Sequence, residues 1–304
     1  MGEQAVDFDY ESLRVLEAVV RTGSFEHASK LLNVTQSAVS QRIKQLEERV
    51  GSLLIVRGRP CVATEDGMLL CQHVDQVTLL QHELRDRMQG VTGGPRVAAN
   101  VKIAVNNDSL ATWFAKVMKR AGEELNLRLE VIPDDQDFTE ERLRSGEALA
   151  VVTTNDQAIP GCHLLPLGAM TYICVASPAF AAQYFKAGMT LESVAAAPAI
   201  IFDRKDTLPA QWLRAAFGAT HALSAHNVPS YEGHMRCCLE SVGWAVMPTL
   251  SVLPLVRSGE LVELVPGSRV PVTLQWQFRT QSSNLLVRLS DIVAEVAAKE
   301  LEPF

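Results

Sequence analysis

Apolar residues recur at helical spacing near the start of the chain. Val39, Ile43, Leu46 and Val50 follow one another at intervals of four, three and four, which places them on one face of a helix. The preceding stretch, 25–32, is a shorter amphipathic segment. The pattern therefore predicts two short helices whose apolar faces share one core.

Polar residues mark the turn between these helices and the outer face of the second. Asn33 suits the left-handed backbone that ends a helix, and Thr35 is a favourable N-cap. Hydroxyl, amide and cationic side chains follow, and such groups hydrogen-bond base edges and phosphates. The candidate DNA contacts on this helix are Thr35, Gln36, Ser37, Ser40, Gln41, Arg42 and Lys44. The segment resembles a helix-turn-helix that reads the DNA major groove, with an ordinary amphipathic helix pair as the alternative.

The next stretch adds positive charge. A short apolar run at 53–56 predicts a strand, and the turn after it displays Arg57 and Arg59, which we expect to contact phosphates as a wing. Between residues 36 and 60 there are five cations (Arg42, Lys44, Arg49, Arg57, Arg59) against two acids (Glu47, Glu48), although the whole chain has a net charge of −7. A local basic excess in an acidic protein favours a DNA-binding segment.

Residues 66–90 show a heptad pattern. The apolar positions are Leu70, Val74, Val77, Leu84 and Met88, with Gln81 in the one missing slot. Such a seam predicts a linker helix that dimerises with an identical partner, and the alternative is a helix packed on its own chain. Gly90, Gly93, Gly94 and Pro95 predict that the helix breaks into a hinge.

Strands and helices alternate after Arg96. Strands are predicted at 97–105, 127–131 and 148–153, with helical patterns at 110–118 and 140–145 between them. The alternation restarts near Thr171, with strands at 172–176, 199–202 and 244–247, helices at 209–217, 231–241 and 249–257, and a last strand and helix at 272–278 and 284–299. This order predicts an α/β fold with parallel β-α-β units in two lobes, like a periplasmic binding protein, after an all-α N-terminal part.

Composition and motifs exclude several classes. The 304 residues are 47% hydrophobic, which suits two or three domains with sizeable cores. The chain has neither an apolar run of about 18 residues nor a secretory signal, so we expect a cytoplasmic protein without a membrane partner. The seven histidines form no metal-binding pair, and no HExxH, GxSxG, Walker or GxGxxG motif occurs, so no enzyme, cofactor or metal is expected. The six cysteines lack CxxC spacing and are expected to be free thiols, although the adjacent Cys237 and Cys238 leave thiol-based redox sensing open.

The motifs together resemble a known family. Residues 8–90 look like the N-terminal part of a LysR-type transcriptional regulator, in the segments 10–21, GSF at 23–25, TQSAVSQRIKQLE at 35–47 and ATEDG at 63–67. VNNDSLATW at 105–113, ERLRSGE at 141–147 and the run 160–162 resemble the branch that activates exporters of lysine and arginine. Some members of that branch are also described as inhibitors of replication initiation.

The resemblance implies a domain organisation. We expect a winged helix-turn-helix at 8–65, a dimerising linker helix at 66–90 and a two-lobed effector-binding domain at 96–304. Lobe one would comprise 96–166 and 271–304, and lobe two 167–270, with crossovers near 154–167 and 265–272. The resemblance also implies homodimers paired into homotetramers on double-stranded DNA, and it leaves a contact with RNA polymerase open.

The cleft between the lobes is the expected site of a small effector. Its candidate residues follow predicted strands or begin predicted helices: Asp108, Ser109, Thr153, Asn155, Asp203, Ser230 and Glu232. The three acids suit the cationic groups of lysine or arginine, and Ser109 and Ser230 suit its carboxylate. Simple helix capping is the alternative role for these residues. A different metabolite, or a small-molecule binding protein without a DNA role, also stays open.

Overall fold

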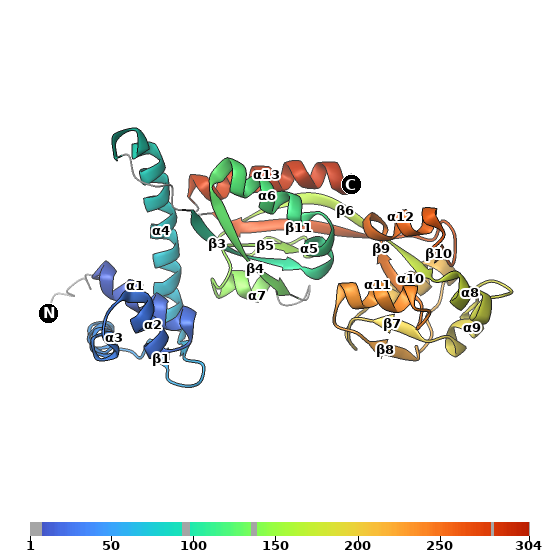
Figure 1. Cartoon of the computed structure of the whole chain (residues 1–304), viewed down its shortest axis with the longest axis horizontal. Coiled ribbons are helices and arrows are strands. Elements are labelled where there is room, and N and C mark those ends of the chain that lie inside the picture. The colour runs from blue at the N-terminus through green and yellow to red at the C-terminus, as the bar shows by residue number, and fades with distance from the viewer. Residues whose placement is uncertain (1–7, 93–97, 135–138, 281–282, 304) are drawn as a thin grey trace.

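The computed structural model describes residues 8–92, 98–134, 139–280 and 283–303. Figure 1 shows three parts in a row: an N-terminal helical head with a long helix, a first lobe and a second lobe. No helix in these ranges is both long and apolar enough to cross a membrane.

The head forms from the helices that the apolar pattern predicts. They are α1 (Tyr10–Thr22), α2 (Phe25–Leu32) and α3 (Gln36–Val50). Asn33 ends α2 in the left-handed conformation, with φ 54° and ψ 42°, and the Thr35 hydroxyl accepts the Ala38 N–H at 3.2 Å as the N-cap of α3. Val39, Ile43 and Leu46 are buried against α1 and α2. The turn therefore has the local chemistry that fixes a helix-turn-helix.

A two-stranded wing and a long helix follow. The wing is β1 (Ile55–Val56) paired antiparallel with β2 (Val62–Ala63), and the helix is α4 (Glu65–Thr92). The helix continues through Gly90 to Thr92, so the break predicted at Gly90 is wrong. The rest of the predicted hinge, Gly93 to Pro95, lies outside the described residues. A single glycine in a helix costs only about 1 kcal/mol, which the surrounding turns of α4 can offset.

The predicted heptad seam is divided between two environments. Val74 is buried in the core of the head, so the first half of the seam packs on its own chain. Leu84 and Met88 are 57% and 42% exposed, on the end of α4 that projects beyond the head (Figure 1). Leu80, one turn before Leu84, is 55% exposed and extends this stripe. Of the described seam positions, those in the second half of α4 therefore present an apolar face for a partner helix.

The middle of α4 is docked on lobe one. Leu79 is 3% exposed and belongs to the same apolar core as the strands of that lobe. The Gln72 side chain donates to the Ser145 carbonyl, and the Glu83 carboxylate accepts the Leu285 N–H at 2.7 Å. These contacts tie the head and lobe one together through one helix.

Asp75 lies in the same docked stretch of α4. Burial and the nearby Glu17 carboxylate raise its pKa to about 6, although Lys102 opposes this shift. The raised pKa belongs to the folded state. The contribution of protonated Asp75 to the free energy of unfolding is therefore fully present below about pH 4, and it is lost as the pH rises through about 6.

Replacing Asp75 by asparagine is therefore expected to stabilise the protein at neutral pH. The variant removes a half-buried charge, and a shift of about two pKa units corresponds to about 2 to 3 kcal/mol. Urea unfolding at about pH 7 and about pH 4 should show the gain only at the higher pH. The exposed Asp291 of α13 supplies the control, Asp291→Asn. An equal gain at both pH values would contradict the assignment to Asp75.

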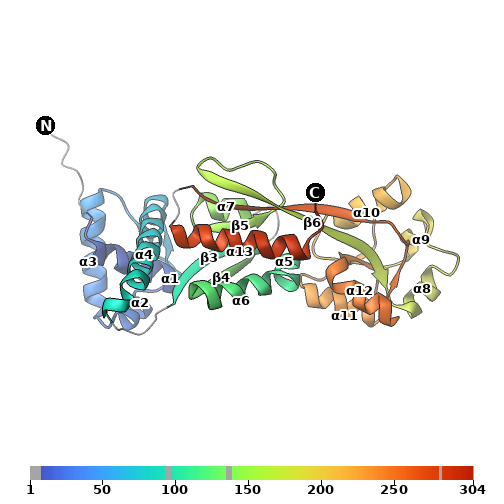
Figure 2. The ribbon, with the colours of Figure 1, turned by 90° about the horizontal axis from the view of Figure 1, so that it is seen from above.

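Lobe one contains the predicted parallel strands. They are β3 (Ala99–Asn106), β4 (Leu127–Asp134) and β5 (Ala150–Thr153), and β3 pairs in parallel with both others. The helices of the lobe are α5 (Asn107–Thr112), α6 (Phe114–Leu125), α7 (Thr139–Arg144) and α13 (Asn284–Glu300). The single helix predicted at 110–118 is thus two, with Trp113 between α5 and α6. Figure 2 shows α6 and α13 side by side against the sheet.

Two long strands run from lobe one into lobe two (Figures 1 and 2). They are β6 (Cys162–Ala176) and β11 (Val270–Arg279), which pair antiparallel with a register shift between Leu274 and Gln275. In lobe one β11 also pairs antiparallel with β5. The sheet is therefore mixed, with the order β10-β6-β11-β5-β3-β4 and β9 also paired to β6, and the predicted parallel pairing is confined to β3, β4 and β5 within it. The crossovers themselves are strands, because each satisfies the backbone hydrogen bonds of the other.

Lobe two contains the shorter elements. The strands are β7 (Ala199–Ile201), β8 (Ala225–Asn227), β9 (Ala245–Pro248) and β10 (Val262–Glu263), and the helices are α8 (Pro178–Tyr184), α9 (Leu191–Ala196), α10 (Leu208–Phe217), α11 (Tyr231–Leu239) and α12 (Thr249–Ser258). The strands β8 and β10 and the helices α8 and α9 were not predicted. Lobe two packs around Trp212 and Trp244, both fully buried with ring centroids 6.4 Å apart.

Candidate functional site

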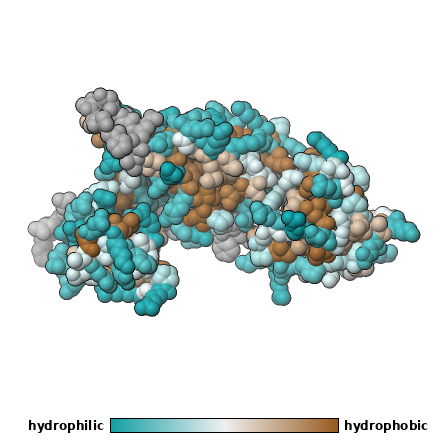
Figure 3. Space-filling view, in the orientation of Figure 1, coloured by the Kyte–Doolittle hydropathy of each residue, from teal (hydrophilic) through white to brown (hydrophobic). Residues whose placement is uncertain are grey.

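The outer face of α3 is polar and open. Gln36, Ser37, Gln41, Arg42 and Lys44 are exposed, as is Thr35, while Ser40 is half-buried. Lys44 forms an exposed ion pair with Glu48 at 3.6 Å. In the space-filling view the surface of the head is largely hydrophilic (Figure 3). A helix with this face, held at a fixed angle by α1 and α2, suits the major groove.

The wing is held beside this helix by its own contacts. The Glu47 carboxylate of α3 accepts the Leu54 N–H at 2.9 Å, which fixes the start of the wing. Gly23 has φ +64°, and a Cβ there would lie 2.8 Å from the Pro60 Cβ, so the wing turn packs where only glycine fits. The guanidinium of Arg57 lies 5.3 Å from the centre of the Phe25 ring. Both Arg57 and Arg59 are exposed.

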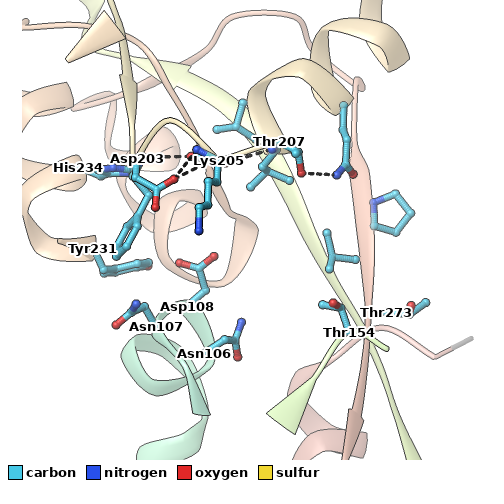
Figure 4. A pocket seen from close by; sticks show the side chains of 17 residues that line it. Asn106, Asn107, Asp108, Thr154, Asp203, Lys205, Thr207, Tyr231, His234 and Thr273 are labelled. Carbon is cyan, nitrogen blue, oxygen red and sulfur yellow. Dashed lines mark hydrogen bonds between the residues drawn. The ribbon is translucent and has the colours of Figure 1, made fainter. Parts of the chain in front are cut away.

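A cavity with a volume of about 410 Å³ lies between the two lobes. Figure 4 shows side chains entering from both sides: Asn106, Asn107 and Asp108 from lobe one, and Asp203, Tyr231 and His234 from lobe two. Thr154 and Thr273 lie at the crossing strands. The cavity has the size of a small-ligand pocket, and its walls belong to lobes that only two strands connect.

Asp108 is the most distinctive group in this cavity. Its Oδ2 accepts a hydrogen bond from the Tyr172 hydroxyl at 2.7 Å. Burial raises the pKa of its carboxyl to about 6, against the opposing effect of the Tyr172 bond, and the carboxylate of Asp206 adds to the rise. A half-buried carboxylate with a perturbed pKa in a cleft is a strong candidate for binding a cation.

The acids of lobe two have a different role. The Asp203 carboxylate accepts the N–H groups of Lys205 at 2.6 Å and Asp206 at 3.1 Å. The Asp206 carboxylate accepts those of Phe202 and Leu208, both at 3.0 Å. These bonds fold the 202–208 loop over the cavity, and they occupy the acids with structural hydrogen bonds.

Two buried polar side chains in the cavity wall have unsatisfied atoms. Within the described part of the chain, no partner hydrogen-bonds the amide nitrogen or oxygen of Asn106, which is 3% exposed, or Nε2 of His234. Burial lowers the pKa of His234, so its ring is neutral near pH 7. Buried polar groups are normally paired, so these atoms are suited to a polar ligand.

Comparison with known proteins identifies both parts of the chain. Residues 10–68 match the bacterial regulatory helix-turn-helix proteins of the lysR family, and residues 96–298 match the LysR substrate binding domain. The chain belongs to the LysR family of transcriptional regulators. The predicted fold class, with its helix-turn-helix and two-lobed α/β domain, is confirmed. The residue boundaries given above for the three domains stay predictions.

Relatives of this LysR-type regulator match it over nearly the full length. The transcriptional regulator ArgP of Pseudomonas fluorescens is 37% identical over 299 residues, covering 98% of this chain and 99% of the relative. The crystal structure of ArgP from Mycobacterium tuberculosis has a TM-score of 0.81 at 36% identity and covers 98% and 100% of the two chains. LysG from Corynebacterium glutamicum, with bound effector Arg, has a TM-score of 0.70 at 31% identity and covers 97% and 100%.

The structure divides the seven predicted effector residues into two groups. Asp108 and Asp203 line the cavity, whereas Ser109, Thr153, Asn155, Ser230 and Glu232 do not. Ser109 is fully buried, and Ser230 caps α11 by accepting the Gly233 N–H at 3.1 Å. These five residues are outside the lining of the cavity, and a role for them in binding the effector stays a prediction. Thr153 is the buried last residue of β5, and the residue that lines the cavity is Thr154, which follows the strand.

Several cavity residues were not expected from the sequence. Tyr231 and His234 lie one turn apart on α11, and Asn106 ends β3. The three-residue spacing of Tyr231 and His234 places both on one face of the predicted helix, and this spacing could have indicated that they face the cavity together. The folding of the 202–208 loop, which brings Asp206 into the wall, has no such periodic signal.

The environment of Cys238 does not favour a redox-sensing role, whereas its neighbour Cys237 is half-buried and leaves that alternative open. Cys238 is fully buried, and burial raises its pKa to about 12. Its thiol is therefore protonated at neutral pH and a poor nucleophile. All six cysteines are free.

Replacing Arg57 by alanine is expected to weaken DNA binding about equally on all sequences. The exposed guanidinium is placed to neutralise one phosphate, so the salt dependence of log K should flatten by about one unit. Fluorescence anisotropy with several duplexes at graded salt measures both quantities. Arg257→Ala, an exposed arginine of lobe two, is the control. A changed sequence preference with an unchanged salt slope would instead assign Arg57 to base contact.

Proposed function

We propose that this LysR-type regulator binds lysine or arginine in the cavity between its lobes and changes its hold on DNA in response. The observation that carries the proposal is the half-buried Asp108 carboxylate in the cavity wall, hydrogen-bonded on one oxygen. A side-chain ammonium or guanidinium is the natural partner for such a group. The relative from Corynebacterium glutamicum that holds Arg as effector supports the same ligand class.

The opposite end of the ligand has partners as well. An amino acid carries an ammonium, which donates hydrogen bonds, and a carboxylate, which accepts them, so an unpaired side-chain amide can pair with either group. The Asn106 side chain, with both polar atoms unpaired and buried, is suited to this end. The neutral His234 ring supplies one further polar atom from lobe two. Contacts from both lobes give a ligand different affinities for open and closed arrangements, which is the requirement for a population shift.

The proposal extends to assembly and targets. The exposed apolar stripe on α4 supports a homodimer through the linker helices, and the family resemblance implies homotetramers on double-stranded DNA. RNA polymerase is the further partner implied at a promoter, and the cytoplasm is the compartment that holds these partners. The expected targets are genes for export or metabolism of the basic amino acid. The protein is proposed to act by binding alone, as a regulator and not as an enzyme.

Thermal unfolding in the presence of each of the twenty amino acids tests the proposal. A ligand at about 100 times its dissociation constant adds about 2.7 kcal/mol of stability. Lysine, arginine or both are expected to raise Tm, whereas neutral and acidic amino acids are not. Lysine amide and arginine amide, which lack the carboxylate, report whether this group contacts the Asn106 side chain. Stabilisation by none of the basic amino acids would contradict the proposal and leave the DNA-binding role intact.

A further inference from the structure

The crossing strand β6 places one polar side chain against the effector cavity without lining it. Tyr172 is 1% exposed, and its hydroxyl donates to Asp108 Oδ2 at 2.7 Å. Its backbone is the point at which β6 changes partners. Tyr172 is opposite Val270 of β11 on one side and opposite Pro248 of β9 on the other. A residue with strands on both sides is held more firmly than the loops that form the rest of the wall.

Asp108 itself lies on a short element. The helix α5 has only six residues, and the Asn106 side chain at its N-cap makes no capping hydrogen bond. The carboxylate therefore depends on tertiary contacts for its orientation. Among the described residues, the hydroxyl of Tyr172 is the side-chain group that hydrogen-bonds it. The bond uses one of the two carboxylate oxygens, which leaves acceptor capacity for a ligand.

The same bond has an electrostatic effect. Burial favours the protonated form of Asp108, and a donor to the carboxylate favours the ionised form. Only the ionised form attracts a cation. A firm donor from β6 thus fixes both the direction and the charge of the group that receives the ligand.

We propose that Tyr172 is a positioning residue that orients the Asp108 carboxylate, and keeps it ionised, for the cationic group of the effector. The inference rests on the proposed function, since it assigns a role in the same site. It also links the site to the strand that joins the lobes, because the residue that holds Asp108 belongs to the crossing itself. If Tyr172 had a purely structural role, its ring alone would suffice, because the ring packs in the main core and the hydroxyl would not be needed.

Tyr172→Phe separates these roles, because it keeps the ring and removes the hydroxyl. Isothermal calorimetry of the full chain with L-arginine, from about pH 5.5 to about pH 8.5, is the measurement. The variant is expected to bind about tenfold more weakly near neutral pH, and its loss of affinity on acidification should begin at a higher pH than in the wild type. The deficit should narrow at the alkaline end, where Asp108 ionises without help. Tyr184→Phe, in α8 and stacked on Phe180, is the matched control and should equal the wild type.

A second readout does not depend on affinity alone. Calorimetry in buffers of different ionisation enthalpy counts the protons released when arginine binds. Near pH 6.5 Tyr172→Phe should release more protons than the wild type, because more of its Asp108 starts protonated. Introducing 4-aminophenylalanine at this position restores a donor and should return both affinity and proton count toward wild-type values. This variant also keeps the test decisive if the phenylalanine variant folds poorly.

The outcomes separate the two claims. The positioning role would be overturned if Tyr172→Phe matched the wild type in affinity, pH dependence and number of protons released. If Asp108→Asn abolished binding in the same experiments, the proposed effector would stay in place. Failure of the wild type to bind arginine or lysine at any pH would overturn the proposed function and, with it, this inference.

Discussion

Replacing Asp108 by asparagine is expected to weaken binding of arginine and lysine by about a hundredfold or more. Losing one partner of a desolvated ion pair costs about 2 to 5 kcal/mol, much of it from leaving the other charge unpaired. The fold should survive, because the asparagine Oδ1 can still accept the Tyr172 hydrogen bond. Calorimetric titration with each amino acid measures the loss, and the dependence of affinity on pH near 6 should disappear with it.

Glu232→Gln is the matched control for this experiment. The sequence analysis expected Glu232 to line the same cleft, but the residue is exposed on α11 and does not line the cavity. Its substitution should leave the affinity unchanged. Equal losses in the two variants would show that general negative charge, and not the half-buried carboxylate of Asp108, attracts the ligand.

Leu84→Asp is expected to separate the protomers and to reduce DNA affinity by about a hundredfold or more. Leu84 is 57% exposed in the single chain and lies between Leu80 and Met88 on the projecting end of α4. A charge in the centre of this seam would be buried on dimerisation at a large cost. Without a dimer each head binds its half-site alone, so the gain from simultaneous engagement is lost.

Sedimentation velocity and anisotropy with a duplex of two half-sites measure the two effects. Leu250→Asp, a partly exposed leucine of α12 in lobe two, is the control and should keep both assembly and affinity. A Leu84→Asp protein that stays dimeric would place the dimer contact elsewhere. A monomer with unchanged DNA affinity would contradict the proposed link between assembly and binding.

The sequence predicts the head better than the lobes, for a physical reason. The helices α1 to α3 depend on local signals, such as the apolar face of α3, the Asn33 turn and the Thr35 cap. The long strand β6 depends on pairing with β11, about a hundred residues later in the chain, and the run 162–171 contains Pro166 and Gly168. Strand extension through non-local pairing leaves little trace in a window of sequence. The Ser177-Pro178 start of α8 was a local signal that could have revealed this missed helix.

The effector site shows the same division. The sequence places the cavity at the ends of strands, and Asp108 and Asp203 do line it. Which neighbouring residue faces the cavity depends on how each strand end and helix start packs, and the cavity is lined by Asp108 and Thr154 but not by Ser109 or Thr153. The structural role of Asp203 follows from backbone N–H groups that only the folded loop brings together. Tyr172 could not be recognised, because its contact with Asp108 spans 64 residues.

A crystal structure of the full chain with L-arginine tests the central claim most directly. We expect arginine in the interlobe cavity, with its guanidinium hydrogen-bonded to the Asp108 carboxylate and its amino-acid end against the Asn106 side chain. The Tyr172 hydroxyl should still donate to Asp108 in that complex. Arginine bound outside the cavity, or inside it with its guanidinium directed away from Asp108, would contradict the account.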